Sequence, residues 1–438
     1  MKKTIFVLLI LSGCGFITPT EQTKVHTGSP KNIIVMIGDG MGPSYTTAYR
    51  YFNDDQTTDK VERTIFDRLL VGMASTSPAN VDGYITDSAA SATALATGVK
   101  TYNKAIAVDV NKQPIENLFE KARKAGKNTG LVVTSSINHA TPAAFMVHNE
   151  SRYNNDDLAD AYFDERANGQ FKADVMLGGG LKYFKRDDRD LVTEFSQAGY
   201  QTINTMEQLA NLDYNNKKVL GLFANDGLPA RLNDKNNNRL QKQAVAAIRL
   251  LEKEDKGFVL LIEGSQIDWA GHDNNIASVM AEMNDFAETM EWVEQYVKDN
   301  PDTLMIATAD HNTGGMTLSS GEIFDWQPHW LKNISMSPYK MAKSIVNGTL
   351  KLADISTVLG FNLTNDEINA LETARNLGTD DLDTAIKKLL DLRTNTGWTT
   401  VGHTAVDVQV FAKGVKSEIF SGAQDNTDIG EKLLQLLD

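Results

Sequence analysis

Short apolar runs recur along the chain, and amphipathic stretches separate them. The runs are rich in Val, Ile and Leu and occupy residues 33–37, 130–133, 175–177, 219–223, 258–262, 304–307 and 408–411. We expect each run to form a buried strand, because unbroken hydrophobic runs are typical of strands covered on both faces. Helical patterns lie between them, for example at 115–125, which Gly126 ends, and at 273–299, which Pro301 ends. The alternation predicts an α/β fold, a three-layer sandwich around a mostly parallel central sheet.

Residues 322–397 break this rhythm. Helical patterns occupy 338–358, 365–376 and 380–392, and no run in this stretch is convincing as a strand. We therefore predict one large domain over residues 32–438 that contains a helical insert at 322–397. Long inserts near a site are often functional, so we expect this one to cover the cleft or to form the contact of a homodimer. A purely structural role is the alternative.

Composition and charge limit the classes of function. The chain has 438 residues, of which 41% are hydrophobic, so it can bury a large core. Its formal net charge of −14 at pH 7 argues against nucleic acid as a specific partner. The same charge would repel an anionic substrate. Chemistry on such a substrate would therefore need local positive charge from metal ions or arginine.

The N-terminus has the pattern of a bacterial lipoprotein signal. Two lysines precede an apolar run at 5–11 that is too short to span a membrane, and the Leu-Ser-Gly-Cys sequence that ends at Cys14 resembles a lipobox. We predict that residues 1–13 are a signal peptide, that lipidated Cys14 anchors the protein to a membrane, and that 14–31 form a flexible tether. The protein would then be exported to the periplasm or the cell surface. A cysteine buried in an ordinary core is the alternative.

Cys14 is also the only cysteine of the chain. No intramolecular disulfide is therefore possible. Any zinc ligands must be histidine or carboxylate.

Three of the predicted strands are followed by carboxylates. Asp39 follows the first strand, Glu263 follows the run at 258–262, and Asp310 stands beside His311 after the run at 304–307. In open α/β sheets, ligands bind in the crevice outside the carboxyl ends of the strands. Each carboxylate taken alone is more typical of an ordinary turn. Three of them in register, with histidines beside them, favour a metal site.

Two further histidines strengthen the metal interpretation. Asp268 and His272 are spaced i, i+4 and would share a face if residues 268–272 form a helical turn. Carboxylate and imidazole together suit zinc. Only seven histidines occur in the chain, and His272, His311 and His403 each lie near a predicted strand edge. A hydrogen-bonded core or turn histidine is the alternative for each one.

A run of small residues follows Thr86 and ends at Gly98, so we expect a helix that begins at Asp87 or Ser88. The positive end of a helix dipole favours both a developing alkoxide and a bound phosphate, which would suit a serine nucleophile there. Either residue could instead be a simple N-cap.

The strand near Thr134 is followed by His139, Thr141 and, further on, Arg152. An arginine fork can bind two phosphate oxygens, although a lone arginine is usually a solvated surface residue.

Taken together, these segments strongly resemble the alkaline phosphatase family, in colinear order from Asn32 to about Gly414 apart from the insert. The resemblance implies hydrolysis of small phosphate monoesters through a phosphoserine on Ser88, with Arg152 binding the phosphate. It also implies two zinc ions and one magnesium ion. The implied ligands of the zinc ion beside Ser88 are Asp39, Asp310 and His311, those of the other zinc are Asp268, His272 and His403, and those of the magnesium are Asp39, Thr141 and Glu263, with His139 nearby.

Two positions depart from the best-studied bacterial members, which carry Asp in place of His139 and Lys in place of Trp269. The His and Trp pair resembles a cold-adapted bacterial branch. It leaves the chemistry in place, but it changes the third metal site and removes a cation near the phosphate.

Other functions remain as alternatives. A related metal-dependent phosphodiesterase or sulfatase would share the sheet and the paired zinc site, but such enzymes usually carry Thr or a modified Cys as the nucleophile. A metal-binding surface lipoprotein without catalysis would be expected to lack Ser88 or Arg152, and both are present.

Overall fold

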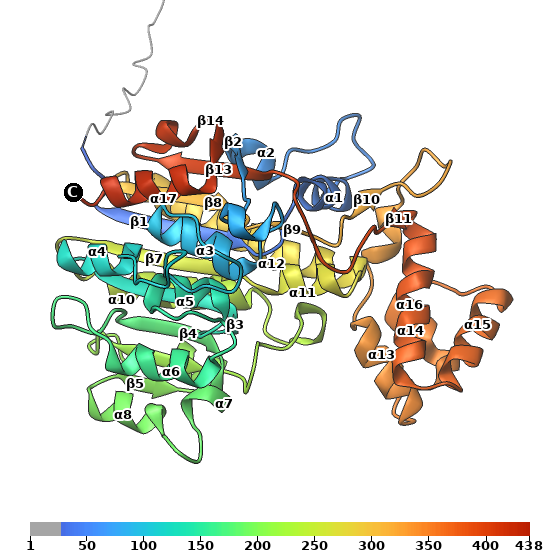
Figure 1. Cartoon of the computed structure of the whole chain (residues 1–438). Helices are drawn as coiled ribbons and strands as arrows, with labels where there is room; N and C mark the ends of the chain where they lie inside the picture. The colour runs from blue at the N-terminus through green and yellow to red at the C-terminus, as the bar shows by residue number, and fades with distance from the viewer. Residues whose placement is uncertain (1–27) are drawn as a thin grey trace, which may run out of the picture.

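A ten-stranded sheet forms the centre of the protein in the computed structural model, which describes residues 28–438 (Figure 1). In space, the strands follow the order β14-β2-β13-β8-β1-β7-β3-β4-β6-β5. Every pair of neighbours is parallel except the two pairs that involve β13, which runs antiparallel to β2 and β8. The prediction of a mostly parallel α/β sheet is therefore confirmed. The strands are β1 (Asn32–Gly38), β2 (Leu70–Ser75), β3 (Asn128–Ser136), β4 (Val175–Gly179), β5 (Gln201–Ile203), β6 (Val219–Leu222), β7 (Phe258–Gly264), β8 (Thr303–Thr308), β13 (Val408–Gly414) and β14 (Gly422–Asp425).

Helices cover both faces of this sheet, with α3, α4, α5 and α17 on the near side in Figure 1 and α10 and α12 behind. Long loops and shorter helices complete the layers. The helices outside the insert are α1 (Pro43–Asn53), α2 (Ile65–Leu69), α3 (Ser88–Thr97), α4 (Leu118–Lys124), α5 (Ala140–Met146), α6 (Asn155–Asp164), α7 (Leu181–Phe184), α8 (Leu191–Gln197), α9 (Met206–Ala210), α10 (Arg239–Leu251), α11 (Gln266–His272), α12 (Ile276–Asp299) and α17 (Asn426–Gln435).

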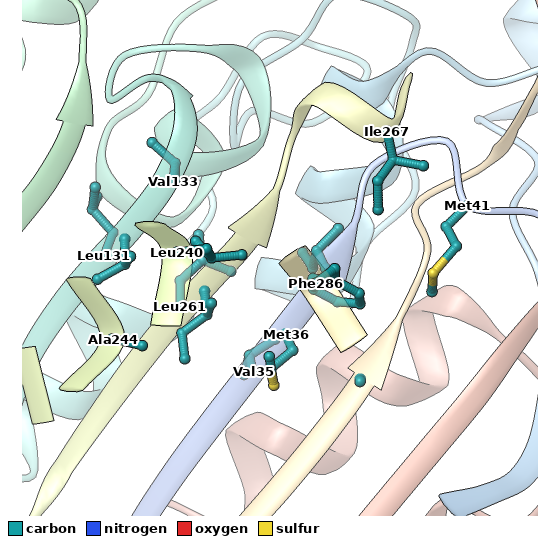
Figure 2. Close-up of a cluster of buried hydrophobic side chains, with 14 of the residues drawn as sticks. Val35, Met36, Met41, Leu131, Val133, Leu240, Ala244, Leu261, Ile267 and Phe286 are labelled. Atoms are coloured by element: carbon teal, nitrogen blue, oxygen red, sulfur yellow. The ribbon is translucent and has the colours of Figure 1, made fainter. Parts of the chain in front are cut away.

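The central strands are apolar throughout because both of their faces are buried. All seven residues of β1 are buried, as are all seven of β7. Figure 2 shows Leu131 and Leu261 of the sheet beside Leu240 and Ala244 of α10, with Phe286 of α12 further along the same layer. Phe286 is fully buried, so its replacement by alanine would cost about 3–5 kcal/mol of stability. This packing holds the strand ends, and the residues that follow them, in fixed positions.

Helices α13 to α16 gather at one end of the molecule, beyond α11 and α12 (Figure 1). The single helix expected over 338–358 is wrong, because the chain divides there into α13 (Pro338–Val346) and α14 (Ile355–Leu359). The break falls at Gly348, whose φ of +80° lies in the left-handed region and cannot continue a helix. The two later helices, α15 (Asn365–Arg375) and α16 (Thr379–Thr394), match the predicted ranges closely.

The stretch 322–397 also contains one short strand, contrary to expectation. Strand β11 (Thr396–Gly397) pairs antiparallel with β10 (Thr317–Leu318), which precedes the stretch. Two-residue strands carry no periodic signal, so the sequence pattern could not reveal them. The pairing joins the two ends of this segment.

Within residues 28–438, none of the helices combines the length and the apolar character needed to cross a bilayer. The predicted signal peptide and Cys14 lie outside the described residues, and their roles stay predictions.

Candidate active site

Three carboxylates meet at the carboxyl edge of the sheet. Asp39 follows β1 directly, Glu263 belongs to β7 and Asp310 lies two residues after β8. The register pairs Ile37 of β1 with Glu263, and also with Thr308 of β8, so the three strand ends lie side by side. All three carboxylates are fully buried. Their proximity follows from parallel pairing, which brings the carboxyl ends of strands to one edge.

A glycine turn allows β1 to approach β8 closely. The backbone N–H of Gly40 donates to Asp310 Oδ1 at 3.0 Å. Gly40 has a φ of +70°, and a Cβ there would lie 2.6 Å from Thr313 Oγ1. Any larger residue at position 40 would therefore force the turn after β1 away from Thr313.

Ser88 is the first residue of α3, as the sequence predicted. Asp87 is the N-cap and accepts a hydrogen bond from the Ala90 N–H at 3.0 Å, and Gly98 ends the helix in the left-handed conformation. The Ser91 hydroxyl donates to the Asp310 carbonyl oxygen at 2.6 Å, which fixes the helix against the end of β8. Ser88 is buried, and its Oγ lies 3.1 Å from His311 Nε2. The serine and the carboxylate edge thus form one site.

The first metal-ligand group surrounds His311. Ligand atoms of Asp39, Asp310 and His311 all lie within 4.8 Å of one another. His311 Nε2 is 3.2 Å from Asp310 Oδ2 and 3.4 Å from Asp39 Oδ1. The group is the one that the family resemblance implied beside Ser88.

A second group contains Asp268, His272 and His403. Residues 268–272 are helical, as predicted, within α11. His272 Nε2 lies 3.3 Å from Asp268 Oδ2 and 3.1 Å from His403 Nε2, and His403 Nε2 lies 3.6 Å from Asp268 Oδ1. The His403 and His311 rings stack with centroids 3.5 Å apart, so His311 belongs to both groups geometrically.

Short strand pairing places His403 beside His311. Strand β12 (His403–Thr404) pairs antiparallel with β9 (Asn312–Thr313), so residues on either side of the helical insert lie together. His403 Nδ1 contacts the Thr86 carbonyl oxygen at 2.8 Å, which orients the ring. A contact of this kind leaves Nε2 available as a ligand.

A third group brings Asp39, His139 and Glu263 within 4.8 Å of one another. Thr141 is fully buried in α5, and its Oγ1 has no hydrogen-bond partner among the described residues. The same is true of both carboxylate oxygens of Asp39 and of Glu263, of Asp310 Oδ2 and of His139 Nδ1. Buried carboxylates are normally paired or bound to metal, so these orphaned oxygens fit the set of cations that the resemblance implied.

Without a bound cation, the ionised forms of the buried carboxylates are unfavourable. Burial, with added repulsion from Asp310, raises the pKa of Glu263 to about 8. Burial, with repulsion from Asp268, raises the pKa of Asp310 to about 7, and burial raises the pKa of Asp39 well above its usual value. Each shift means that burial and the neighbouring carboxylates favour the neutral acid over the ionised form.

In the second ligand group, histidines offset the negative charge of the carboxylate. Burial alone would raise the pKa of Asp268, but contacts with His272, His311 and His403 bring it below its ordinary value. The hydrogen bond with Asp268 raises the pKa of His272 to about 9, against the effect of burial. Without a metal ion, protonated His272 therefore supplies the positive charge that Asp268 requires.

Arg152 reaches the same cleft from the loop after α5. Its Nη1 pairs with Asp87 Oδ2 at 3.1 Å, and its Nη2 lies 3.2 Å from His139 Nε2. Burial, and then the Arg152 charge, lower the pKa of His139 to about 3, so this imidazole is neutral. The Trp269 ring packs edge-on against His139, with centroids 6.1 Å apart. The structure thus brings every residue of the predicted site to one end of the sheet.

Some residues of the site were not foreseen. Thr313 Oγ1 donates to Asp268 Oδ1 at 2.6 Å and contacts His311 Nδ1 at 3.2 Å, so it connects the first and second ligand groups. Its position two residues after His311 was the available signal. Lys104 and Tyr153 line the cleft, which has a volume of about 510 Å³. No local sequence pattern predicted that Lys104 and Tyr153 would belong to the site.

A fourth cluster, Glu120, His148 and Glu165, lies apart from this site. The ammonium group of Lys172 lies 2.8 Å from Glu120 and 2.5 Å from Glu165. A buried lysine therefore already pairs with both carboxylates, and we interpret the cluster as structural.

An α/β sheet whose carboxyl edge gathers buried carboxylates, imidazoles and a helix-terminal serine defines a candidate metal-dependent hydrolase. The sequence model of the alkaline phosphatase family matches residues 30–438. The chain belongs to the alkaline phosphatase family and is a phosphatase.

Similar proteins agree. Alkaline phosphatase 3 of Bacillus subtilis is 44% identical over 95% of this chain and 91% of its own length. The crystal structure of a cold-active alkaline phosphatase from a psychrophilic Shewanella is 50% identical, with a TM-score of 0.88 over 93% of this chain and 100% of its own. The alkaline phosphatase of the Antarctic bacterium TAB5 is 28% identical, with a TM-score of 0.70 over 93% of this chain and 98% of its own. Mutants of that enzyme with a histidine changed to Glu or Asp have Mg bound in its M3 site.

Proposed function

We propose that the protein hydrolyses phosphate monoesters through a phosphoserine on Ser88, with two zinc ions and one magnesium ion as cofactors. The observation that carries the proposal is the set of orphaned buried oxygens on Asp39, Glu263 and Asp310, at the same sheet edge where Ser88 Oγ lies 3.1 Å from His311 Nε2. Ligand atoms lie within 4.8 Å of one another in Asp39, Asp310 and His311, in Asp268, His311 and His403, and in Asp39, His139 and Glu263. His272 Nε2 lies 3.3 Å from Asp268 Oδ2. Zinc would be held by Asp39, Asp310 and His311 and by Asp268, His272 and His403, and magnesium by Asp39, Thr141 and Glu263.

When bound, the divalent ions would supply positive charge that favours ionisation of the serine hydroxyl and neutralises the leaving oxygen. The residues of the chain position the reactants. Ser88 Oγ attacks phosphorus, the bond to the alcohol oxygen breaks, and phosphate stays on the serine. Water then attacks phosphorus, breaks the bond to Ser88 Oγ and releases inorganic phosphate.

Arg152 and the start of α3 hold the transferred group. The guanidinium can donate to two non-bridging oxygens, and Asp87 keeps it aimed at Ser88 through their 3.1 Å contact. Asp87 also caps α3, so the first N–H groups of the helix keep their direction towards the phosphate. These donors are in place before the substrate binds, which favours the transition state.

The covalent step is tested by labelling. The enzyme is incubated with a ³²P-labelled monoester, quenched in acid and digested, and the labelled peptide is sequenced. We expect label on Ser88, none in Ser88→Ala, and retained label in the matched control Ser91→Ala, since Ser91 lies in the same helix and turns away towards the Asp310 carbonyl. Activity of Ser88→Ala should fall by several orders of magnitude without vanishing.

Two results would contradict the proposal. Label on another residue would move the nucleophile elsewhere. Faster hydrolysis of a phosphodiester than of the matching monoester would favour the diesterase alternative.

The proposal includes export and attachment through Cys14, which rests on the sequence pattern alone. Cys14→Ala should release the protein from the membrane fraction. An intact Met1 on soluble protein from wild-type cells would refute it.

A further inference from the structure

The outer part of the cleft has a cation and an aromatic ring that the proposed mechanism does not use. Lys104 and Tyr153 both line the cleft. The Lys104 ammonium lies 5.9 Å from the centre of the Tyr153 ring, and the Tyr153 residue is 67% exposed. Among residues 28–438, no carboxylate forms an ion pair with Lys104. These two side chains are therefore free to contact a bound molecule.

The backbone fixes Lys104 next to the phosphate-binding residues. Its N–H donates to Asp87 Oδ1 at 3.0 Å, and its carbonyl oxygen accepts from the Arg152 N–H at 2.8 Å. Its φ of +82° lies in the left-handed region, where glycine would be more comfortable. Lys104 therefore has a strained backbone conformation at the point where its N–H and carbonyl groups connect Asp87 to Arg152. Strain at such a place is a reason to look for a function of the side chain.

The charges of the cleft show what this side chain can bind. Arg152, deeper in the cleft, is engaged by Asp87, whereas Lys104 at the exposed end has no acidic partner. The protein as a whole carries a formal charge of −14, so an unpaired ammonium at the mouth of its site is a local exception. Lys104 lies further out in the cleft than Arg152, which binds the phosphate in the proposed mechanism. A second negative charge on the leaving group of the substrate would therefore lie close to the Lys104 ammonium.

We propose that Lys104 and Tyr153 form a leaving-group subsite that favours phosphate monoesters whose alcohol carries a second negative charge, either a carboxylate or another phosphate. Tyr153 offers a face for the body of the leaving group, and Lys104 binds its anion. The inference rests on the proposed function, because it concerns the other half of the same substrate. The bonds made and broken are unchanged.

The test compares three esters with the same phosphorylated end. We suggest 4-(carboxymethyl)phenyl phosphate, its neutral methylamide, and 4-(aminomethyl)phenyl phosphate as the cationic member. A fourth ester with a second phosphate in place of the carboxylate separates the two anion sources. For each, kcat/KM is measured for wild type, Lys104→Gln and Lys104→Glu at low and at high salt.

For Lys104→Gln, we expect the anionic-to-neutral ratio of kcat/KM to fall about three- to fivefold at low ionic strength, mainly through KM, and the cationic-to-neutral ratio to rise. Lys104→Glu should shift both ratios further in the same directions. High salt should reduce both effects, because this charge is exposed and screened.

Lys112→Gln is the matched control. Lys112 is also an exposed lysine with a positive φ, +64°, but it pairs with Glu150 at 2.6 Å and does not line the cleft. Its replacement should leave the ratios at their wild-type values.

Unchanged ratios in both Lys104 variants would overturn the subsite. So would an equal loss on all esters, which would show that residue 104 acts only through its backbone contacts with Asp87 and Arg152. If the wild-type enzyme hydrolyses none of the esters, the proposed function itself fails.

Discussion

Removing the metal ions should destabilise the fold strongly, and the effect should grow with pH. Chelation would leave Asp39, Glu263 and Asp310 with at least five buried oxygen atoms that have no hydrogen-bond partner. Protonation relieves part of this cost, because the folded pKa values of Glu263 and Asp310 are raised to about 8 and about 7. A raised carboxyl pKa stabilises the apo fold only while the proton stays bound. That stability is present at low pH and is lost as pH rises through 7 to 8.

The magnitude follows from the orphaned atoms. Each buried unsatisfied polar atom costs about 1–3 kcal/mol, so the five carboxylate oxygens cost roughly 5–15 kcal/mol when all are ionised. For a chain of this length, that corresponds to a fall in Tm of about 6 to 18 °C. At pH 7, Glu263 and Asp310 together should hold about one to two protons in the apo protein, and these must leave when metal binds.

Two measurements test this. Differential scanning fluorimetry with and without chelator should show a larger fall in Tm at pH 9 than at pH 6. An indicator dye should record at least two protons released when zinc and magnesium are added to the apo protein at pH 7, because protonated His272 must also lose its proton to bind zinc, and fewer at pH 9.5. Glu263→Gln should release about one proton fewer at pH 7. Equal Tm shifts at both pH values, or no proton release at pH 7, would refute the reasoning.

Arg152→Ala should weaken inhibition by inorganic phosphate about tenfold or more, and Arg152→Lys should restore only part of it, because an ammonium cannot bind two oxygens in the plane of a fork. Equal inhibition of the wild type, Arg152→Ala and Arg152→Lys by phosphate would contradict a role of Arg152 in phosphate binding. His139→Asp should increase affinity for magnesium in calorimetric titration, since a carboxylate replaces a neutral imidazole beside Asp39 and Glu263. Unchanged affinity would show that position 139 does not face that ion. Asp391→Asn should stabilise the fold at pH 8 by about 1–3 kcal/mol and hardly at all at pH 4, because burial raises the pKa of Asp391 to about 7. Asparagine keeps the oxygen that accepts from Trp398 Nε1, so thermal unfolding at the two pH values isolates the charge.

The interior of the sheet could be predicted from the sequence because its strands are buried on both faces. The run at 33–37 became β1 with one residue added at each end, and the run at 258–262 became β7 with two residues added at its C-terminal end. Strands β2, β14 and β5 were missed. β14 and β2 lie at one edge of the sheet and β5 at the other, and all three are only partly buried, so their apolar signal is weak.

The antiparallel direction of β13 could not be predicted either. Its sequence, Val-Gln-Val-Phe-Ala-Lys-Gly, carries no signal of direction, and only the route of the chain from the insert decides which way it runs. The candidate site was easier, since parallel strands bring residues such as Asp39 and Asp310 to one edge whatever the loops do. The proposed role of Lys104 could not be predicted from the sequence, because it depends on a left-handed backbone conformation. An isolated lysine in a loop has no recognisable sequence pattern.

The position of His403 shows how a long insert can be compatible with a precise site. About ninety residues separate His403 from His311, and closing a flexible loop of that length would cost entropy. Two short antiparallel pairings, β9 with β12 and β10 with β11, join the segments that enter and leave the insert. The helices between them pack on one another and on α12, so the loop is closed by folded structure rather than by a flexible chain. The stability of that helical segment and the geometry of the second ligand group are therefore coupled, although none of the implied ligands lies within 322–397.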